Sequence, residues 1–228
     1  MRTARRVAVS LLSAPLLVLP LAAAPPTATA AAVCTVTGFT PTRVVVGLSP
    51  VTATFAPKGT GCTVSYWNVR GGAYDFYASS SAPRQTFAPT SNAATEPMDV
   101  RVTVHNPDYD QQSKSFPNSF ILKRQTVWDG FNASPEPVKK GAKIAIKGRI
   151  RLADWSKRTY TGYSGRLVSV EFRTSTGTYR QVRTATTGTG GYLSTTVTAG
   201  ADGYWRVRYG GNAIAGGSSA PGDFVDVN

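Results

Sequence analysis

Alternation of apolar and polar side chains at every second position is the feature that most constrains how this chain can fold. In an extended strand, successive side chains point to opposite faces, so this pattern buries one face and exposes the other. It runs through residues 98–105, 142–152 and 203–209. The expected inward side chains are Val100, Val102 and Val104, then Ile144, Ile146, Ile150 and Leu152, and finally Trp205, Val207 and Tyr209.

Composition supports strands over helices in the same way. From Val33 onward the chain has 20 Val and 25 Thr but five Leu. β-Branched side chains lose rotamer freedom in a helix and fit a pleated sheet. We therefore predict an all-β fold of antiparallel sheets, with Trp67 and Trp205 as large rings of the core.

The first 32 residues have the features of an export signal. Basic residues precede an apolar run from Val7 to Ala24, and small residues follow it. A retained membrane anchor is the alternative, but Pro15 and Pro20 interrupt a span barely long enough to cross a bilayer. We expect cleavage near Ala32, secretion to an extracellular location and no transmembrane anchor afterwards. The choice between general and twin-arginine export stays open.

Cys34 and Cys62 are the only cysteines in the chain. Export places them in an oxidising compartment, where a disulfide is the natural state of such a pair. A reactive thiol pair is the alternative, but the spacing does not match C-x-x-C, and no neighbouring His or Lys would lower a thiol pKa. We predict a structural disulfide near the start of the mature chain.

A weak internal repeat indicates two domains of similar size. Residues 39–47 are echoed by residues 131–141, each with an aromatic residue, a proline-bent stretch and a glycine before a strand. A period of about 100 residues is the size of an immunoglobulin-like domain. We predict a signal peptide followed by two immunoglobulin-like antiparallel β-sandwich domains in tandem, with bounds of 1–32, 33–126 and 127–228.

Several short motifs of the second half carry a resemblance to known modules. They are Pro135–Gly141, Lys147-Gly148, Val168–Phe172, Gly191-Tyr192 and Gly203–Gly210. Together they resemble the immunoglobulin-like modules of proteins secreted by actinobacteria. The resemblance covers residues 127–228, and the first domain fits it more loosely. It implies a fold, a secretion route and a spacer, adhesion or ligand-binding role, but no single activity.

The chain is poor in the residues that catalytic sites and metal sites require. His105 is the only histidine, and its phase in the alternation predicts a solvated side chain at a strand end. No G-x-S-x-G or S-x-x-K motif occurs. Asp108 with Asp110, or Asp223 with Asp226, offers oxygen ligands to calcium, but calcium sites usually collect more acidic oxygens. We expect no enzyme activity, no cofactor and no metal site.

Positive charge gathers in the second half of the chain. Residues 33–126 contain eight basic and five acidic residues, whereas residues 127–228 contain 14 and seven. The basic residues expected to point outward are Lys143, Lys147, Arg149 and Arg151 on one strand and Arg206 and Arg208 on another. Such a surface attracts anionic polymers, although charge that only aids solubility is the alternative. No motif for specific nucleic-acid recognition is present.

The stretch 154–166 joins two expected strands and is rich in aromatic and basic residues. Its candidate ligand-binding residues are Trp155, Lys157, Arg158, Tyr160 and Tyr163. Loops at the end of an immunoglobulin-like sandwich often bind ligands, and flat rings beside cations suit a sugar or a protein surface. The alternative is that these rings fold back over the open end of the core.

Three hypotheses about function follow from the sequence. The first is a secreted, noncatalytic binding or adhesion module whose partner is an anionic cell-wall polymer or another polysaccharide of the cell surface. The second is a structural or accessory protein that acts through contacts with another extracellular protein. The third is a small hydrolase with a carboxylate mechanism, because twelve carboxylates leave room for a catalytic pair.

Overall fold

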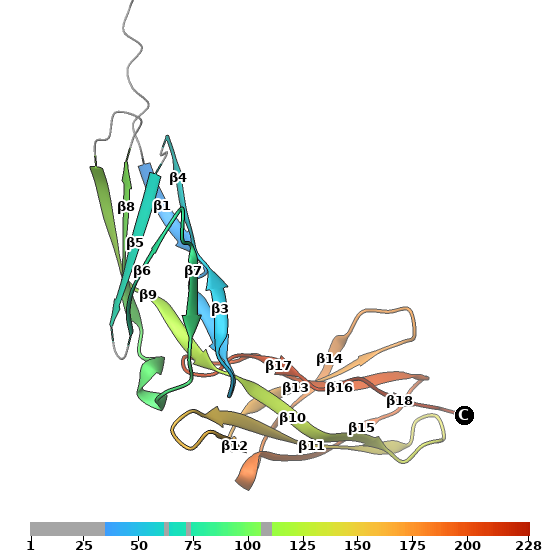
Figure 1. The fold of residues 1–228 in the computed structure, drawn as a ribbon. Helices are drawn as coiled ribbons and strands as arrows, with labels where there is room; N and C mark the ends of the chain where they lie inside the picture. Colours follow the sequence, from blue (N-terminus) through green and yellow to red (C-terminus); the bar gives the residue numbers. More distant parts are fainter. Residues whose placement is uncertain (1–34, 62–63, 72–73, 106–110) are drawn as a thin grey trace, which may run out of the picture. The chain divides into compact units, whose positions relative to one another are not determined.

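The computed structural model describes residues 35–61, 64–71, 74–105 and 111–228 (Figure 1). The predicted signal peptide, Cys34, Cys62 and the pair Asp108 and Asp110 lie outside the described residues. Within these ranges the chain forms strands and two short 3-10 turns, η1 (Asn92–Thr95) and η2 (Thr189–Gly191). The predicted all-β fold is confirmed. No helix in the described part of the chain is long and apolar enough to span a membrane.

The first nine strands form one wide sheet and two strand pairs. The wide sheet has the order β2-β9-β8-β5-β6, and the pairs are β1-β4 and β3-β7. Their bounds are β1 (Thr35–Thr40), β2 (Arg43–Val46), β3 (Val51–Thr54), β4 (Ala56–Thr60), β5 (Val64–Gly71), β6 (Tyr74–Ser79), β7 (Arg84–Phe87), β8 (Met98–His105) and β9 (Gln111–Arg124).

Aromatic rings dominate the core of this first group of strands. Trp67 is buried, as predicted, and the valines of β8 lie in the same core. Four phenylalanines pack together with ring centroids 5.2 to 6.2 Å apart, namely Phe55, Phe76, Phe87 and Phe120. Tilted and edge-on ring pairs at these separations add about 0.5–1.5 kcal/mol beyond the burial of their area. The first core therefore depends on rings as much as on β-branched residues.

The remaining strands form two sheets around a second core. One sheet has the order β10-β11-β12 with β15 also on β11, and the other has the order β14-β13-β16 with β17 and β18 on β16. Their bounds are β10 (Thr126–Ser134), β11 (Lys143–Asp154), β12 (Thr159–Gly162), β13 (Leu167–Arg173), β14 (Arg180–Thr186), β15 (Tyr192–Thr198), β16 (Gly203–Tyr209), β17 (Ser218–Ser219) and β18 (Asp223–Val225).

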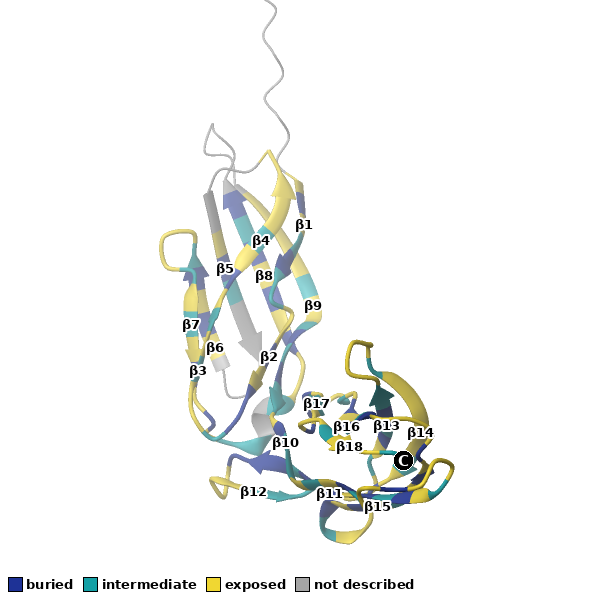
Figure 2. Cartoon of the chain, turned by 90° about the vertical axis from the view of Figure 1, so that its right-hand side faces the viewer, coloured by how far each residue is buried: buried dark blue, intermediate teal, exposed yellow. Residues whose placement is uncertain are grey.

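The predicted alternation of buried and exposed side chains is confirmed in all three stretches. Figure 2 shows buried and exposed residues alternating along β8. In β11 the isoleucines and Leu152 are buried, and in β16 so are Trp205, Val207 and Tyr209. The residues that alternate with them face solvent, so each of these strands has one buried side and one solvent-exposed side.

One ladder departs from the prediction of antiparallel sheets. β2 runs parallel to β9, with Val44 opposite Leu122 and Val46 opposite Arg124. Val44 and Val46 are buried, and they lie along the edge of β9 that β8 does not occupy. The direction of β2 is therefore set by burial against a strand far away in sequence, which the pattern of four residues cannot reveal.

The boundary between the two groups of strands is a single residue. Gln125 separates β9 from β10, and its backbone N–H donates to Val46 O at 2.8 Å while its carbonyl accepts from Ala153 N at 2.9 Å. Gly47 lies close by, where a Cβ would come within 2.4 Å of the Gln125 side chain. The division into two domains stays a prediction.

The predicted disulfide has a direct test. Thr35, next to Cys34, is paired with Thr60, two positions before Cys62. We expect a Cys34–Cys62 bond that closes a loop of about 28 residues and adds roughly 3 kcal/mol to the free energy of unfolding. Thiol titration of the unfolded secreted protein should find no reactive thiol before reduction and two after it. Two reactive thiols in the protein that has not been reduced would contradict the prediction.

Candidate functional site

The stretch predicted as a ligand-binding loop, residues 154–166, contains a β-hairpin. β11 ends at Asp154, and β12 returns along it with Ala153 opposite Tyr160. Arg158 completes the turn in the left-handed region, with a φ of 50°. The expected loop is therefore partly a strand, because its Thr-Tyr-Thr segment suits a pleated sheet and pairs with the end of β11.

Trp155 is buried in the first core. Its side chain is 1% exposed, and it packs among residues of the first nine strands. The indole Nε1 donates to the carbonyl oxygen of Val46 at 3.2 Å. With both its ring and its only polar atom engaged, Trp155 offers no open face on which a ligand could stack.

The other residues of that prediction divide between packing and exposure. Tyr160 packs against the first core and donates its hydroxyl to Gln125 Oε1 at 2.5 Å. Tyr163 packs against the second core. Lys157 and Arg158 are exposed at the turn. The two cations thus lie together at the turn, whereas Trp155 and Tyr160 pack on the first core and Tyr163 packs on the second.

Asp154 anchors the start of the hairpin to the segment around η1. Its Oδ1 accepts a hydrogen bond from Asn92 Nδ2 at 2.9 Å and another from the backbone N–H of Lys157 at 3.0 Å. The N–H of Trp155 donates in turn to Asn92 Oδ1 at 2.8 Å. The bond from Asn92, followed by that from Lys157, lowers the pKa of the Asp154 carboxyl below its ordinary value.

The predicted basic residues lie on the outer faces of two different sheets. Lys143, Lys147, Arg149 and Arg151 follow β11, whereas Arg206 and Arg208 follow β16. β11 belongs to one sheet of the second core and β16 to the other. The positive charge is therefore divided between two surfaces.

Half of these basic side chains already have partners. Arg149 donates its Nε to Gly190 O at 2.9 Å, and Arg151 pairs with Asp129. Arg206 Nε lies 2.7 Å from Glu171 Oε2, its register partner on β13. Lys143, Lys147 and Arg208 are exposed, and their side chains make no hydrogen bond or ion pair within the described residues.

A polar face that the sequence analysis missed covers the outer side of β5, β6, β8 and β9. Two rows of side chains cross the strands in register. One row contains Ser79, Tyr66, Thr103 and Ser113, and the next contains Tyr77, Asn68, Arg101 and Ser115. These side chains point outward because the residues that alternate with them along each strand, such as Trp67 and Val102, are buried in the first core. Rows on one face of a strand are about 7 Å apart.

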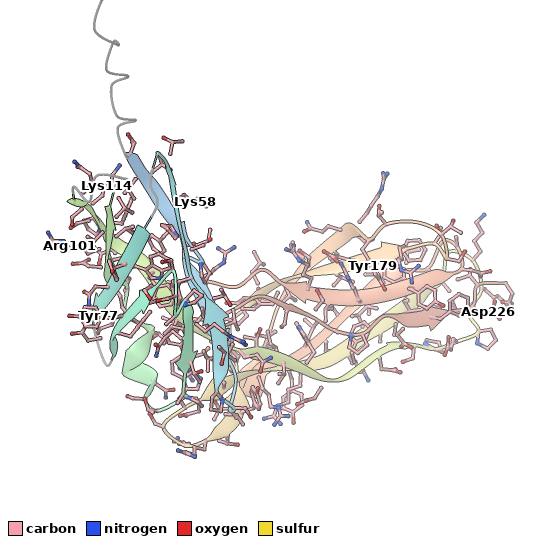
Figure 3. The ribbon with its side chains drawn as sticks, turned by 45° about the horizontal axis from the view of Figure 1, so that its top comes forward. Lys58, Tyr77, Arg101, Lys114, Tyr179 and Asp226 are labelled. Carbon is pink, nitrogen blue, oxygen red and sulfur yellow. The ribbon has the colours of Figure 1, made fainter. Side chains whose placement is uncertain are left out.

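A hollow of about 650 Å³ lies on this face. Its lining includes Asn68, Tyr77, Asp99, Arg101, Thr103, Ser113, Ser115 and Pro117. Figure 3 shows Tyr77 and Arg101 projecting from the same side of the sheet. Tyr77 is 70% exposed, and Tyr66 in the adjacent row is 50% exposed. The face therefore presents two accessible rings beside a row of short polar side chains.

Hydrogen bonds hold several of these polar side chains in place. Asn68 Nδ2 donates to Asp75 Oδ1 at 3.3 Å, and the hydroxyls of Thr103 and Ser113 are 2.9 Å apart. Arg101 is exposed and makes no side-chain hydrogen bond or ion pair within the described part of the chain. The face thus offers fixed acceptors, hydroxyls and one exposed cation, a set suited to binding.

The described residues contain no assembled metal site. No three His, Cys, Asp or Glu side chains among them are placed to hold an ion. Asp223, one of the four aspartates considered for calcium, accepts the N–H of Ala133 on its Oδ2 at 2.7 Å. His105 ends β8, and its side chain lies outside the described part of the structure.

Comparisons with known proteins give solved structures only. No protein-family model matches the chain, and neither does any curated protein. The chain is similar to a bacterial ice-binding adhesin studied for host cell surface retention, with 16% identity and a TM-score of 0.31 over 86% of this chain and 65% of the other. It is also similar to three N-terminal domains of the highly immunogenic outer capsid protein of bacteriophage RB49, with 11% identity and a TM-score of 0.30 over 86% of this chain and 70% of the other. The resemblance to actinobacterial modules stays a prediction.

Replacing Trp155 with Ala tests whether this ring is structural. We expect Trp155→Ala to lower the free energy of unfolding by about 3–5 kcal/mol, because a large buried ring is lost and a cavity remains. Lys157→Ala, two positions along in the exposed turn, should change it by less than about 0.5 kcal/mol. Urea unfolding measures both. An unchanged midpoint for Trp155→Ala would show that the ring is not packed.

The lowered pKa of Asp154 predicts a pH dependence. A carboxyl whose pKa is lower when folded stabilises the protein above its unfolded pKa, and this contribution is lost as the pH falls through the folded value. Asp154→Asn keeps an acceptor for Asn92 and Lys157 but removes the titration. We therefore expect its thermal midpoint to fall less between neutral and acidic pH than that of the unmodified protein. If the thermal midpoints of the two proteins fall equally with pH, the lowered pKa of Asp154 is contradicted.

Proposed function

We propose that this protein is a noncatalytic binding module for extracellular polysaccharide and that the outer face of β5, β6, β8 and β9 is its binding surface. The observation that carries the proposal is the placement of two exposed tyrosine rings, Tyr66 and Tyr77, in register with hydroxyl, amide and guanidinium groups.

The chemistry of sugars matches such a surface. A sugar ring has a face of C–H groups, which packs on an aromatic ring, and an edge of hydroxyls, which both donate and accept hydrogen bonds. Tyr77 supplies the ring, and Asn68, Arg101 and Ser115 in the same row supply hydrogen-bond donors and acceptors. A sheet fixes these groups at regular intervals, so little conformational freedom is lost on binding.

Charge on this face favours a neutral polymer. Arg101 is a cation, but Asp99 also lines the hollow and Asp75 lies in the next row beyond Tyr77. A highly anionic polymer would meet these carboxylates, whereas a neutral glycan uses them as hydrogen-bond acceptors. The hollow of about 650 Å³ is within the size range of known ligand sites.

Removing the two rings tests the proposal. We expect Tyr66→Ala and Tyr77→Ala each to weaken binding to a soluble neutral polysaccharide by about tenfold, because exposed aromatic anchors dominate such contacts. Affinity electrophoresis in gels that contain dextran, xylan or mannan measures the change. Both rings are well exposed, so the thermal midpoint should change little.

Tyr192→Ala is the matched control, because Tyr192 is also a well-exposed tyrosine, 59% exposed, but lies on a sheet of the second core. It should leave affinity for the neutral polymers unchanged. Equal losses for all three variants, or no retardation by any of the polymers, would refute the proposed surface. Recovery of one extracellular protein partner whose binding depends on Tyr66 or Tyr77 would favour an accessory protein instead.

A further inference from the structure

A second hollow, of about 470 Å³, lies on the outer face of β10, β11 and β15. The side chains that line it include Lys147, Arg149, Tyr192 and Ser194. Lys147 pairs in register with Ser194, and Arg149 with Tyr192. Lys147, Arg149 and Tyr192 therefore surround a small area of the sheet. The short side chain of Ser194 leaves space between them.

A bulge and glycine residues in the backbone leave the space that forms the hollow. The register of β10 against β11 shifts between Asp129 and Asn132, which is a β-bulge. Gly130 lies in this bulge with a φ of 54°, a conformation that favours glycine, and it brings no side chain to the rim. The main chain at Gly148 and Leu193 also lines the hollow. β-Bulges are common beside functional sites.

Two contacts fix the position of the Arg149 side chain. Its Nε donates to Gly190 O at 2.9 Å, and its guanidinium lies 4.8 Å from the centre of the Tyr192 ring. These two contacts leave the terminal nitrogens without a hydrogen bond in the described structure. A guanidinium fixed in this way can donate two parallel hydrogen bonds to one anionic group.

Local charge balance selects the ligand class. Asp129 also lines the hollow, but Arg151 pairs with it and offsets its charge. Lys147 and Arg149 therefore leave the site positive. Tyr192 is 59% exposed and supplies a face on which a flat or puckered ring can lie.

We infer that this hollow is a binding site for an acidic sugar unit, whose ring lies against Tyr192 and whose anionic group is bound by Arg149 and Lys147. The site is separate from the face of β5, β6, β8 and β9 and does not depend on the function proposed for it. A carboxylate and a phosphate both satisfy the two cations, so the shared chemistry is an anionic group carried on a sugar polymer.

Binding to two acidic polymers tests this inference. The probes are polygalacturonate, which carries carboxylates, and a glucose-substituted poly(glycerol phosphate), which carries phosphates, with dextran as the neutral reference. We expect Lys147→Gln and Arg149→Gln each to weaken binding to at least one acidic polymer by about tenfold, because each removes a charge-assisted contact. The polymer affected identifies the anionic group.

Two charge-matched variants separate a site from a general positive field. Lys143→Gln removes the same charge from the same strand, and Arg208→Gln removes it from the other sheet. Both should change the affinity by less than about twofold at 150 mM salt, where the field of an exposed charge is screened within about 8 Å.

Three results would overturn the inference. The first is an equal loss for all four charge variants, which indicates a nonspecific field. The second is the absence of binding to both acidic polymers. The third is binding of a 20-base-pair DNA duplex as tight as that of the acidic polymers and equally sensitive to Lys147→Gln, which indicates an anion site without sugar recognition.

Tyr192→Ala adds a further check, because it should weaken acidic-polymer binding without affecting a neutral polymer.

Discussion

Burial of valine, isoleucine and aromatic rows on one side of each sheet is the constraint on which the rest of the structure depends. Because side chains alternate along a strand, every inward Val or Trp fixes an outward neighbour on the solvent side. In the first core, burial of Trp67 and Val102 places Asn68, Tyr66 and Arg101 outward. The core and both candidate binding surfaces are therefore two sides of the same pattern, and a register shift of one residue would exchange them.

The hairpin of β11 and β12 joins the two cores. Trp155 comes from the segment that follows β11, yet it packs with the first nine strands, and Asp154 bonds to Asn92. Tyr160 and Gln125 close the same region by a hydrogen bond. Aromatic residues that resemble a ligand loop in sequence thus have a structural role where the chain passes from β9 to β10.

The sequence predicts the strands well because their evidence is local. The alternation in β8, β11 and β16 is enough to identify the inward residues, and their burial confirms them. The face of β5, β6, β8 and β9 cannot be found in this way, because Asn68 and Arg101 are far apart in sequence and lie opposite each other only through strand register. The outward residues of β8 are recognisable as a polar set, but nothing in the sequence places Tyr77 beside them. The role of Trp155 is also hidden, since one aromatic residue packs or binds according to what lies opposite it.

The most direct test of the account is to map sugar binding on the protein by amide chemical shifts, with short oligomers of glucose, xylose and mannose as probes. If the outer sheet face is the binding surface, the signals that move belong to β5, β6, β8 and β9, foremost Asn68, Tyr77, Arg101 and Ser115. Shifts confined to the turn at Lys157 and Arg158, or spectra that no oligomer changes, would contradict it.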